Sequence, residues 1–294
     1  MYKINVGGAE IHRVEEMTIR SAMSLLTTDT ALIEKNRHWL LPAFMSENAQ
    51  QRDFVFQSWI VIVDGQVFVI DPCNGNDRPH ILPLFNQLNT PYIERFAATG
   101  IRPEHVNYVF CTHLHHDHCG WSTQLRNGRF VPTFPNARYI YVKREHDLWE
   151  QRRRGDTVDY NTGVFDRSVA PIMKAGLGHL VADQYRISPG MDIEPAYGHT
   201  LGHSMLHLTS DTREAYFTGD VFHHPLQILY PELHLPGCDD LSMAIETRRR
   251  VARLCATKGA LLVPAHFARP HTGYIRAQAE TFSFEPLSLT STTP

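Results

Sequence analysis

The apolar residues of this chain fall into short runs and alternating stretches that predict β-strands. The run SWIVIVDGQVFVIDP (58–72) holds two such stretches on either side of Asp64-Gly65, a dipeptide typical of two-residue hairpin turns. Residues 9–16 alternate between apolar and polar positions, as a half-buried strand does, and residues 106–110 (VNYVF) form a further apolar run. The pattern therefore predicts several strands within the first 110 residues, including one hairpin.

Segments with helical periodicity lie between these strands and a second set of predicted strands further along the chain. The segment PYIERFAAT (91–99) predicts a helix that Gly100 ends, and DDLSMAIETRRRVARLCAT (239–257) predicts a helix with an aspartate cap and Gly259 just past its end. Further helices are expected after a strand at 138–142 and over 164–174, and further strands within 193–210, 214–222, 259–267 and 280–287.

Two stretches lack a single clear periodicity. Residues 17–50 are mixed, and they predict either a lid or dimerisation arm or an ordinary surface extension packed on the core. Residues 155–180 are polar and then helical, which predicts an insertion near the site rather than a separate domain. We expect an N-terminal arm or extension at 1–50, one large domain at 51–286 with a helical insertion at about 155–180, and a flexible tail at 287–294.

Composition and charge limit the classes of function that we expect for this chain. With 294 residues, 43% hydrophobic and 20% charged, the chain can bury a substantial core. A net charge of -3 without a concentrated basic segment disfavours nucleic acid as a partner. The N-terminus lacks the apolar core of a secretion signal, no window approaches 18 apolar residues, and the five cysteines form no C-x-x-C pair. These features predict a cytoplasmic protein that does not enter membranes.

A cluster of metal-binding side chains follows the strand at 106–110. Within HLHHDH, His113 and His115 are two residues apart at a strand's end, so both can reach one ion, and Asp117 and His118 can turn toward a second. So many imidazoles beside a carboxylate are best explained by metal coordination, and the spacing predicts two ions.

HLHHDH resembles the signature of the metallo-β-lactamase superfamily, in which a His, an Asp and a His follow downstream on separate loops. GHTLGHS offers His199, YFTGD offers Asp220 and VPAHF offers His266. The resemblance implies an α+β four-layer αββα sandwich. It also implies that Asp71, at the end of a strand, supports the metal loop by hydrogen bonding, and that His203 is not a ligand. The ligand set it implies is His113, His115 and His199 for one ion, Asp117, His118 and His266 for the other, and Asp220 as the bridge.

Such a centre predicts hydrolysis. Imidazole and carboxylate ligands fit two Zn²⁺ ions, and Mn²⁺, Fe²⁺ or Co²⁺ would also be accepted. A water shared by the pair becomes hydroxide near neutral pH and attacks the substrate, so we count Asp117 and Asp220 as catalytic as well as ligating. The resemblance also implies a homodimer.

The expected substrate class depends on which branch of the superfamily the chain resembles. The ligand set is similar to that of lactonases, glyoxalase II and organophosphate hydrolases, but only 28 residues follow His266, too few for the helical domain of glyoxalase II. Acyl homoserine lactonases place a Tyr three residues after the bridging Asp, where this chain has His223; an imidazole there can donate the same hydrogen bond or act as an acid, with His224 as the competing candidate. We predict an esterase or lactonase for a small neutral substrate.

Other readings stay open. The chain also resembles the methyl parathion hydrolase type, which keeps phosphotriester cleavage as an alternative, together with β-lactam amidase and hydrolytic dehalogenase activities. A redox or metal-storage role is a third class. Beside the ligands we nominate four pocket-wall residues, with ordinary core packing as the alternative for the aromatic ones: Phe44, His116, Trp121 and Phe222.

Overall fold

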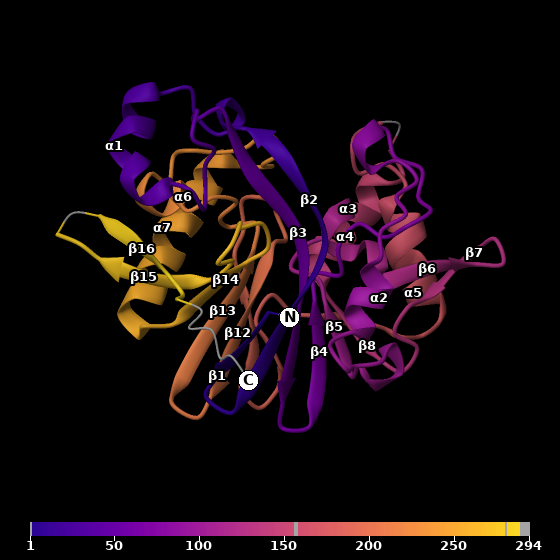
Figure 1. Cartoon of the computed structure of the whole chain (residues 1–294). Helices are drawn as coiled ribbons and strands as arrows, with labels where there is room; N and C mark the ends of the chain where they lie inside the picture. The colour runs from indigo at the N-terminus through magenta and orange to yellow at the C-terminus, as the bar shows by residue number, and fades with distance from the viewer. Residues whose placement is uncertain (1, 156–157, 280, 289–294) are drawn as a thin grey trace.

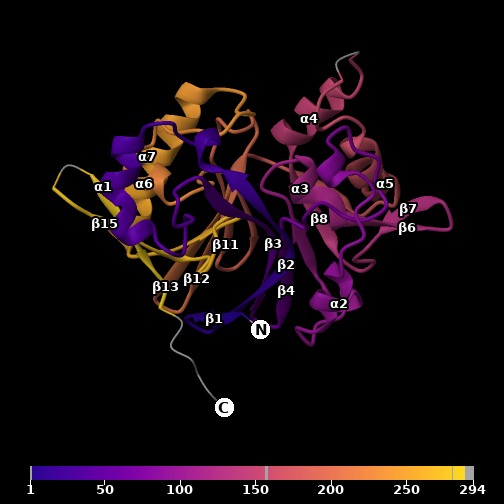
Figure 2. The ribbon, with the colours of Figure 1, turned by 45° about the horizontal axis from the view of Figure 1, so that its top comes forward.

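The predicted strands form two large sheets that lie face to face (Figures 1 and 2). The computed structural model describes residues 2–155, 158–279 and 281–288. The first sheet has the order β1-β2-β3-β4-β5-β8-β9 and the second the order β10-β11-β12-β13-β14-β15-β16. The strands of the first sheet are β1 Lys3–Val6, β2 Ala9–Ala22, β3 Gln51–Val63, β4 Gln66–Ile70, β5 Tyr108–Phe110, β8 Arg138–Val142 and β9 Gly178–Val181. Those of the second are β10 Tyr185–Ser188, β11 Met191–Pro195, β12 Ser204–Ser210, β13 Arg213–Gly219, β14 Leu261–Pro264, β15 Gly273–Ala277 and β16 Phe282–Pro286.

Helices cover the outer face of each sheet (Figure 1). Those labelled α2, α4 and α5 pack on the first sheet, and α1, α6 and α7 pack on the second. A small two-stranded ribbon, β6 (Thr123–Arg126) and β7 (Arg129–Pro132), projects on the side of the first sheet. This is the predicted αββα sandwich of mixed α and β content. The helices are α1 Thr30–Leu40, α2 Tyr92–Ala97, α3 His116–Cys119, α4 Lys143–Arg152, α5 Ala170–Lys174, α6 Leu226–Leu229 and α7 Leu241–Lys258.

Alternation along the strands builds three cores. Successive side chains point to opposite faces, so Val61 contributes to the core between the sheets while its neighbour Ile60 packs under the helices of the first sheet. In the second sheet Phe217 faces the first sheet and Tyr216 faces the helices. The central strands β5 and β14 are covered on both faces, which explains why they are short continuous apolar runs.

The predicted hairpin is confirmed between β3 and β4. Val63 pairs with Gln66, leaving Asp64 and Gly65 as a two-residue turn with φ of 49° and 72°. Positive φ at both positions is what this tight turn requires, and Asp-Gly tolerates it.

The helix predicted at 239–257 is α7. The Asp240 side chain accepts a hydrogen bond from the Met243 amide at 2.9 Å, and Gly259 ends the helix with a φ of 61°. Both termini therefore use the residues that the sequence pattern identified.

The segment predicted as an arm contains more strand than its pattern suggested. Strand β2 does not stop at residue 16 but continues to Ala22, paired with the beginning of β3. A register shift between Glu15 and Met17 leaves Glu16 as a bulge residue, which interrupts the apolar alternation without ending the strand. The boundaries proposed at 50 and 286 remain predictions, because they concern domains rather than elements.

The 155–180 segment leaves and rejoins the first sheet. A turn of π-helix (Phe165–Val169) leads into α5, and β9 then pairs parallel to β8. Residues 156 and 157 of this predicted insertion, and residues 289–294 of the predicted flexible tail, lie outside the described part of the chain.

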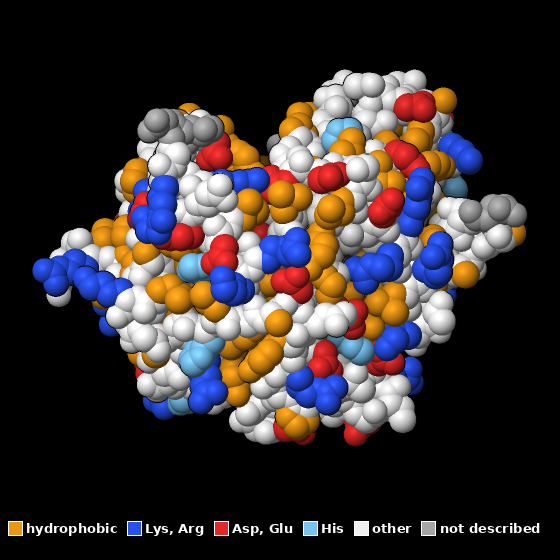
Figure 3. Space-filling view, turned by 180° about the vertical axis from the view of Figure 1, so that it is seen from behind, with side chains coloured by type: hydrophobic (Ala, Val, Ile, Leu, Met, Phe, Trp, Pro, Cys, Tyr) orange, Lys and Arg blue, Asp and Glu red, His pale blue; other side chains and the backbone are white. Residues whose placement is uncertain are grey.

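Basic and acidic side chains are interspersed over the face seen in Figure 3, in line with the small net charge. Of the helices in the described residues, none has the length and hydropathy needed to span a bilayer.

Candidate metal centre

The seven predicted ligands come from loops that follow strands of both sheets. The loop after β5 carries His113 and His115, and the short helix α3 carries Asp117 and His118. The loops after β11, β13 and β14 carry His199, Asp220 and His266, respectively. The structure brings all seven together in two groups within which the donor atoms lie no more than 4.8 Å apart.

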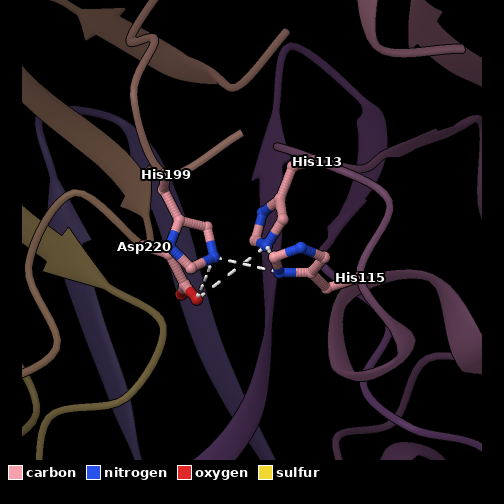
Figure 4. Close-up of side chains that lie close together, drawn as sticks. All are labelled: His113, His115, His199 and Asp220. Atoms are coloured by element: carbon pink, nitrogen blue, oxygen red, sulfur yellow. Dashed lines mark hydrogen bonds and ion pairs between the residues drawn. The ribbon is translucent and has the colours of Figure 1, made fainter. Parts of the chain in front are cut away.

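The first ligand group consists of His113, His115, His199 and Asp220, all buried (Figure 4). His115 Nδ1 lies 3.0 Å from both His113 Nε2 and His199 Nε2. Asp220 Oδ2 completes the group, at 3.2 Å from His199 Nε2 and 3.8 Å from His113 Nε2. Four donor atoms therefore face one point between the two sheets.

The second ligand group consists of Asp117, His118 and His266. His118 Nε2 and His266 Nε2 are 3.3 Å apart, and Asp117 Oδ2 lies 3.6 and 3.5 Å from them. The Asp117 side chain is 12% exposed, whereas those of the two histidines are buried. This group therefore has a side open to solvent.

Asp220 joins the two groups through its two carboxylate oxygens. While Oδ2 faces the first group, Oδ1 lies 3.3 Å from His118 Nε2 and 3.0 Å from His266 Nε2 of the second. Within the part of the chain that is described, buried Oδ1 has no hydrogen-bond partner. A carboxylate in this position can bind one cation with each oxygen.

The spacing of the donor atoms fits metal ions. Ligands about 2.0–2.1 Å from a tetrahedral ion lie about 3.3–3.4 Å from one another. The donor–donor distances given above range from 3.0 to 3.8 Å, and all donor atoms within each group lie within 4.8 Å of one another. The donors are the nitrogen and carboxylate oxygen atoms that Zn²⁺ and similar ions accept.

The protonation states in the first group also suit a metal. Burial lowers the pKa of His113 and His199 well below its usual value and that of His115 to about 3, so these imidazoles stay neutral. Burial opposes ionisation of Asp220, but the imidazoles around it, first that of His118, hold its pKa well below the usual range. Neutral imidazole and ionised carboxylate are the forms that bind metal.

His118 behaves differently. Burial alone would lower its pKa, but the carboxylates of Asp220, Asp117 and Asp71 raise it well above its usual value. The second group therefore attracts positive charge at this position. A bound cation would meet the same demand as the proton.

Two of the ligand imidazoles also contact polar groups outside the ligand set through their second ring nitrogen. His118 Nδ1 lies 3.0 Å from Asp71 Oδ2, and His266 Nδ1 donates to the Val55 carbonyl at 2.8 Å. Asp71 also accepts a hydrogen bond from the Thr112 amide at 2.7 Å, so it ties the end of β4 to the ligand loop. Such partners orient the ring and select its tautomer.

The backbone around Asp220 has its own requirements. His203 Nε2 accepts a hydrogen bond from the Asp220 amide at 3.1 Å, and His203 belongs to neither ligand group. Gly219 has a φ of 49°, and a Cβ there would lie 2.4 Å from Thr112 Oγ1. The glycine of YFTGD is therefore needed to bring Asp220 close to the ligand loop.

The adjacent histidines 223 and 224 point to different places. His223 Nε2 lies 3.1 Å from Asp220 Oδ2, and burial lowers the pKa of this imidazole. His224 Nε2 donates to the Phe44 carbonyl at 2.9 Å, and its Nδ1 accepts from the Leu226 amide. Only His223 therefore borders the ligand groups.

An aromatic wall that the sequence interpretation missed borders the second group. The Phe54 ring stacks on His266 with centroids 4.2 Å apart, and Phe56 meets the same imidazole edge-on at 5.4 Å. Phe85 bridges from Phe56 (5.4 Å) to His116 (4.7 Å). Phenylalanines two residues apart in RDFVF were the available signal, because they share one face of β3.

The four residues predicted to line the pocket lie in different surroundings. His116 lies against this aromatic wall, but Trp121, Phe222 and Phe44 lie in the hydrophobic cores beneath the helices. For these three the pocket-wall hypothesis was wrong, and core packing is what the structure has.

Glu145 is a second residue that the sequence interpretation missed. Its buried carboxylate accepts hydrogen bonds from the Leu114 amide at 2.9 Å and from the Thr200 hydroxyl at 2.7 Å. It thereby connects the loop of His113 and His115 with the loop of His199. No local pattern marks it, because it is one of several charged residues in α4.

The fold and the ligand set define a known class. The family model of the metallo-β-lactamase superfamily matches residues 52–266, and the chain belongs to this superfamily. Its members are metal-dependent hydrolases, and this chain is one. No protein of curated function matches the sequence.

Solved structures resemble the chain over almost its whole length. The hydrolase AbOPH of the β-lactamase superfamily is 21% identical, with a TM-score of 0.80 over 98% of this chain and 97% of its own. AidC, a dizinc quorum-quenching lactonase solved with a bound product, is 18% identical, with a TM-score of 0.76 over 98% and 97%. A probable metal-dependent hydrolase from Staphylococcus aureus is 18% identical, with a TM-score of 0.73 over 98% and 99%. At these identities the likeness establishes the fold.

Proposed function

We propose that this protein is a dinuclear metal-dependent hydrolase that opens a small neutral ester or lactone. The observation that carries the proposal is the position of Asp220, whose two oxygens face two separate groups of histidines. One carboxylate shared in this way is the arrangement expected for two ions that act on one bond.

In this proposal His113, His115 and His199 hold one ion, Asp117, His118 and His266 hold the other, and Asp220 serves both. When bound, two such ions polarise the scissile bond and lower the pKa of water. The aromatic wall formed by Phe54, Phe56 and Phe85 excludes bulk water beside the second ligand group.

His223 is proposed as the catalytic side chain that assists bond breaking. Its Nε2 lies 3.1 Å from Asp220 Oδ2, next to both ligand groups. Because burial lowers its pKa, the imidazole is neutral at pH 7 and acts by donating the Nε2 hydrogen rather than as a charged acid.

Two features support an ester or lactone over a charged substrate. The residues around the open side of the second group are aromatic and neutral, which favours an uncharged ligand. Among the similar structures are AidC and an N-acyl homoserine lactone hydrolase with a bound product, the latter 13% identical with a TM-score of 0.60.

A substrate panel tests the proposal directly. Metal-reconstituted protein is assayed with lactones, aryl esters, phosphotriesters, β-lactams and haloalkanes, beside the variants Asp220→Asn and His207→Gln. His207 lies on β12 outside both ligand groups and is the matched control. We expect the highest kcat/KM on a lactone or ester, lost in Asp220→Asn and kept in His207→Gln. Preference for another class would contradict the substrate assignment, and turnover independent of metal would contradict the mechanism.

The identity of the ions, the oligomeric state and the location are part of the same proposal. We propose Zn²⁺ in both positions, a homodimer and a cytoplasmic enzyme. Native mass spectrometry of purified protein measures the first two together: the expected species is a dimer with four zinc ions.

A further inference from the structure

Arg52, near the beginning of β3, is a buried arginine whose guanidinium forms no hydrogen bond within the described part of the chain. The residue is 2% exposed, and its Nε and Nη1 atoms are buried without a hydrogen-bond partner in residues 2–155, 158–279 and 281–288. Burying an unpaired guanidinium costs several kcal/mol, and buried polar atoms in folded proteins almost always have partners. Arg52 is therefore an exception that calls for an explanation.

The other two buried arginines show what this fold does with such a group. Arg78 donates to the carbonyls of Gly120 and Thr123 and to the Ser168 hydroxyl. Arg248 donates to three backbone carbonyls, those of Val221, Pro231 and Leu233. Both are structural arginines that bind loop carbonyls, and Arg52 lacks any such set.

Within the described residues, no carboxylate forms an ion pair with Arg52. Its guanidinium carbon lies over the Phe54 ring, 4.9 Å from the centroid. The adjacent Asp53 is exposed and pairs with Arg20 at 3.2 Å. His224 uses both ring nitrogens in backbone hydrogen bonds. Burial lowers the pKa of Arg52 to about 10, and no carboxylate of the described residues offsets this effect.

There is also space beside this residue. Arg52 is one of the residues lining a cavity of about 60 Å³ between β3 and the segment that follows α1, with Pro42, Met45 and Ser46 on the other side. Arg20 and Asp53, which pair with each other, also line this cavity. That volume holds a few water molecules or one carboxylate-sized group.

We propose that Arg52 is the anchor of a second ligand site, which binds a small carboxylate separately from the metal centre. A guanidinium presents parallel N–H donors that match the two oxygens of a carboxylate, and Nε and Nη1 of Arg52 have no hydrogen-bond partner among the described residues. One aromatic ring separates this site from the centre, because Phe54 also stacks on His266. A carboxylate at Arg52 would therefore rest against the ring that holds a proposed metal ligand.

The guanidinium can be observed directly. In ¹⁵N-labelled, metal-reconstituted protein, the Nε–Hε resonances of buried arginines are followed while sodium acetate is titrated against sodium chloride at equal ionic strength. The Arg52 resonance is assigned by its absence in Arg52→Lys. We expect a saturable shift with a dissociation constant of about 1–10 mM, as a pair of charge-assisted hydrogen bonds gives. The Arg248 resonance, whose Nε donates to the Val221 carbonyl, is the internal control and should not move.

Each outcome decides the proposal. A saturable shift with acetate but not with chloride supports it, and the same shift in Asp220→Asn separates this site from the metal centre, so that it stands even if the proposed function fails. A shift with inorganic phosphate and none with acetate overturns the carboxylate assignment. No shift, or equal shifts with chloride, shows that Arg52 binds only water or the general ion atmosphere and overturns the site. As a second measurement, acetate should raise the melting temperature of the wild type more than that of Arg52→Met, and equal increases also count against it.

Discussion

The two ligand groups use similar side chains but differ in their enclosure. In the first group His113 is fully buried, the Tyr160 hydroxyl lies 2.9 Å from His115 Nε2, and Trp149 packs edge-on against His115. In the second group Asp117 is 12% exposed, and the rings of Phe54 and Phe56 lie against His266, whose Nδ1 donates to the Val55 carbonyl. In the proposed function, the first group would hold an ion in the more enclosed position, and the second would present its ion to the substrate.

The largest effect should come from the residue that the groups share. Asp220→Asn keeps the shape but removes the charge that serves both groups, so we expect loss of both ions and a decrease in kcat/KM on the order of 10³-fold. Mass spectrometry measures the loss of the ions, and turnover on the best substrate measures the decrease in kcat/KM. Two ions retained with unchanged turnover would contradict the bridging role.

Single-ligand variants sharpen the comparison. His199→Ala removes a ligand of the closed group and His266→Ala one of the open group, and each should retain one ion while turnover falls on the order of 10²-fold. Because the second group is more exposed, we expect its ion to leave first when wild-type protein is dialysed against a chelator. Simultaneous loss of both ions at every chelator concentration would mean that the groups do not differ.

The adjacent histidines provide a matched pair. His223→Gln should lower kcat roughly 10- to 100-fold with both ions retained, because it removes a hydrogen bond to a charged group. His224→Gln should lower the melting temperature and leave kcat unchanged, because His224 bonds only backbone. Equal kcat losses in the two variants would show that His223 acts only through the fold.

The groups should also differ in how pH affects the metal-free protein. The folded pKa of His115 is about 3, below its usual 6.5, so as pH falls from 6.5 toward 4 the unfolded chain takes up a proton that the folded chain refuses. The free energy of unfolding should therefore fall by about 1.4 kcal/mol per pH unit for each such histidine. His118, whose pKa is raised, is protonated in both states there and contributes no slope. Urea unfolding of the wild type and of His115→Gln at several pH values measures the free energy of unfolding. Identical pH slopes for the two proteins would contradict this prediction.

The smallest effect is expected at the aromatic wall. Phe54→Leu removes the ring that stacks on His266 but keeps an apolar side chain, and we expect KM to rise roughly 2- to 10-fold at constant metal content. Phe282→Leu, on β16 at the edge of the second sheet, is the control. A fall in kcat without a change in KM would assign Phe54 to ligand positioning instead of substrate contact.

Local patterns predicted much of the fold. The hairpin at Asp64-Gly65 and the caps of α7 were read correctly because each depends on a few adjacent residues whose backbone preferences dominate. The end of β2 was misread because a bulge at Glu16 breaks the alternation, and only pairing with β3 shows that the strand continues.

The candidate site shows the same division. HLHHDH concentrates four of the proposed ligands in one turn, so periodicity and side-chain chemistry sufficed to nominate them. His199, Asp220 and His266 were found only through resemblance to a superfamily, because their meeting depends on three loops that are far apart in the chain.

The amino-acid sequence alone therefore specified the strands, the turn residues and the types of side chain that bind metal, because these follow from interactions between residues that are neighbours in the chain. Which groups surround the ligands was decided by the packing of the two sheets: Glu145 reaches across to Thr200, Phe54 covers His266, and buried Arg52 has no hydrogen-bond partner among the residues that the structure describes. Such contacts join residues separated by tens to hundreds of positions, and no local preference encodes them.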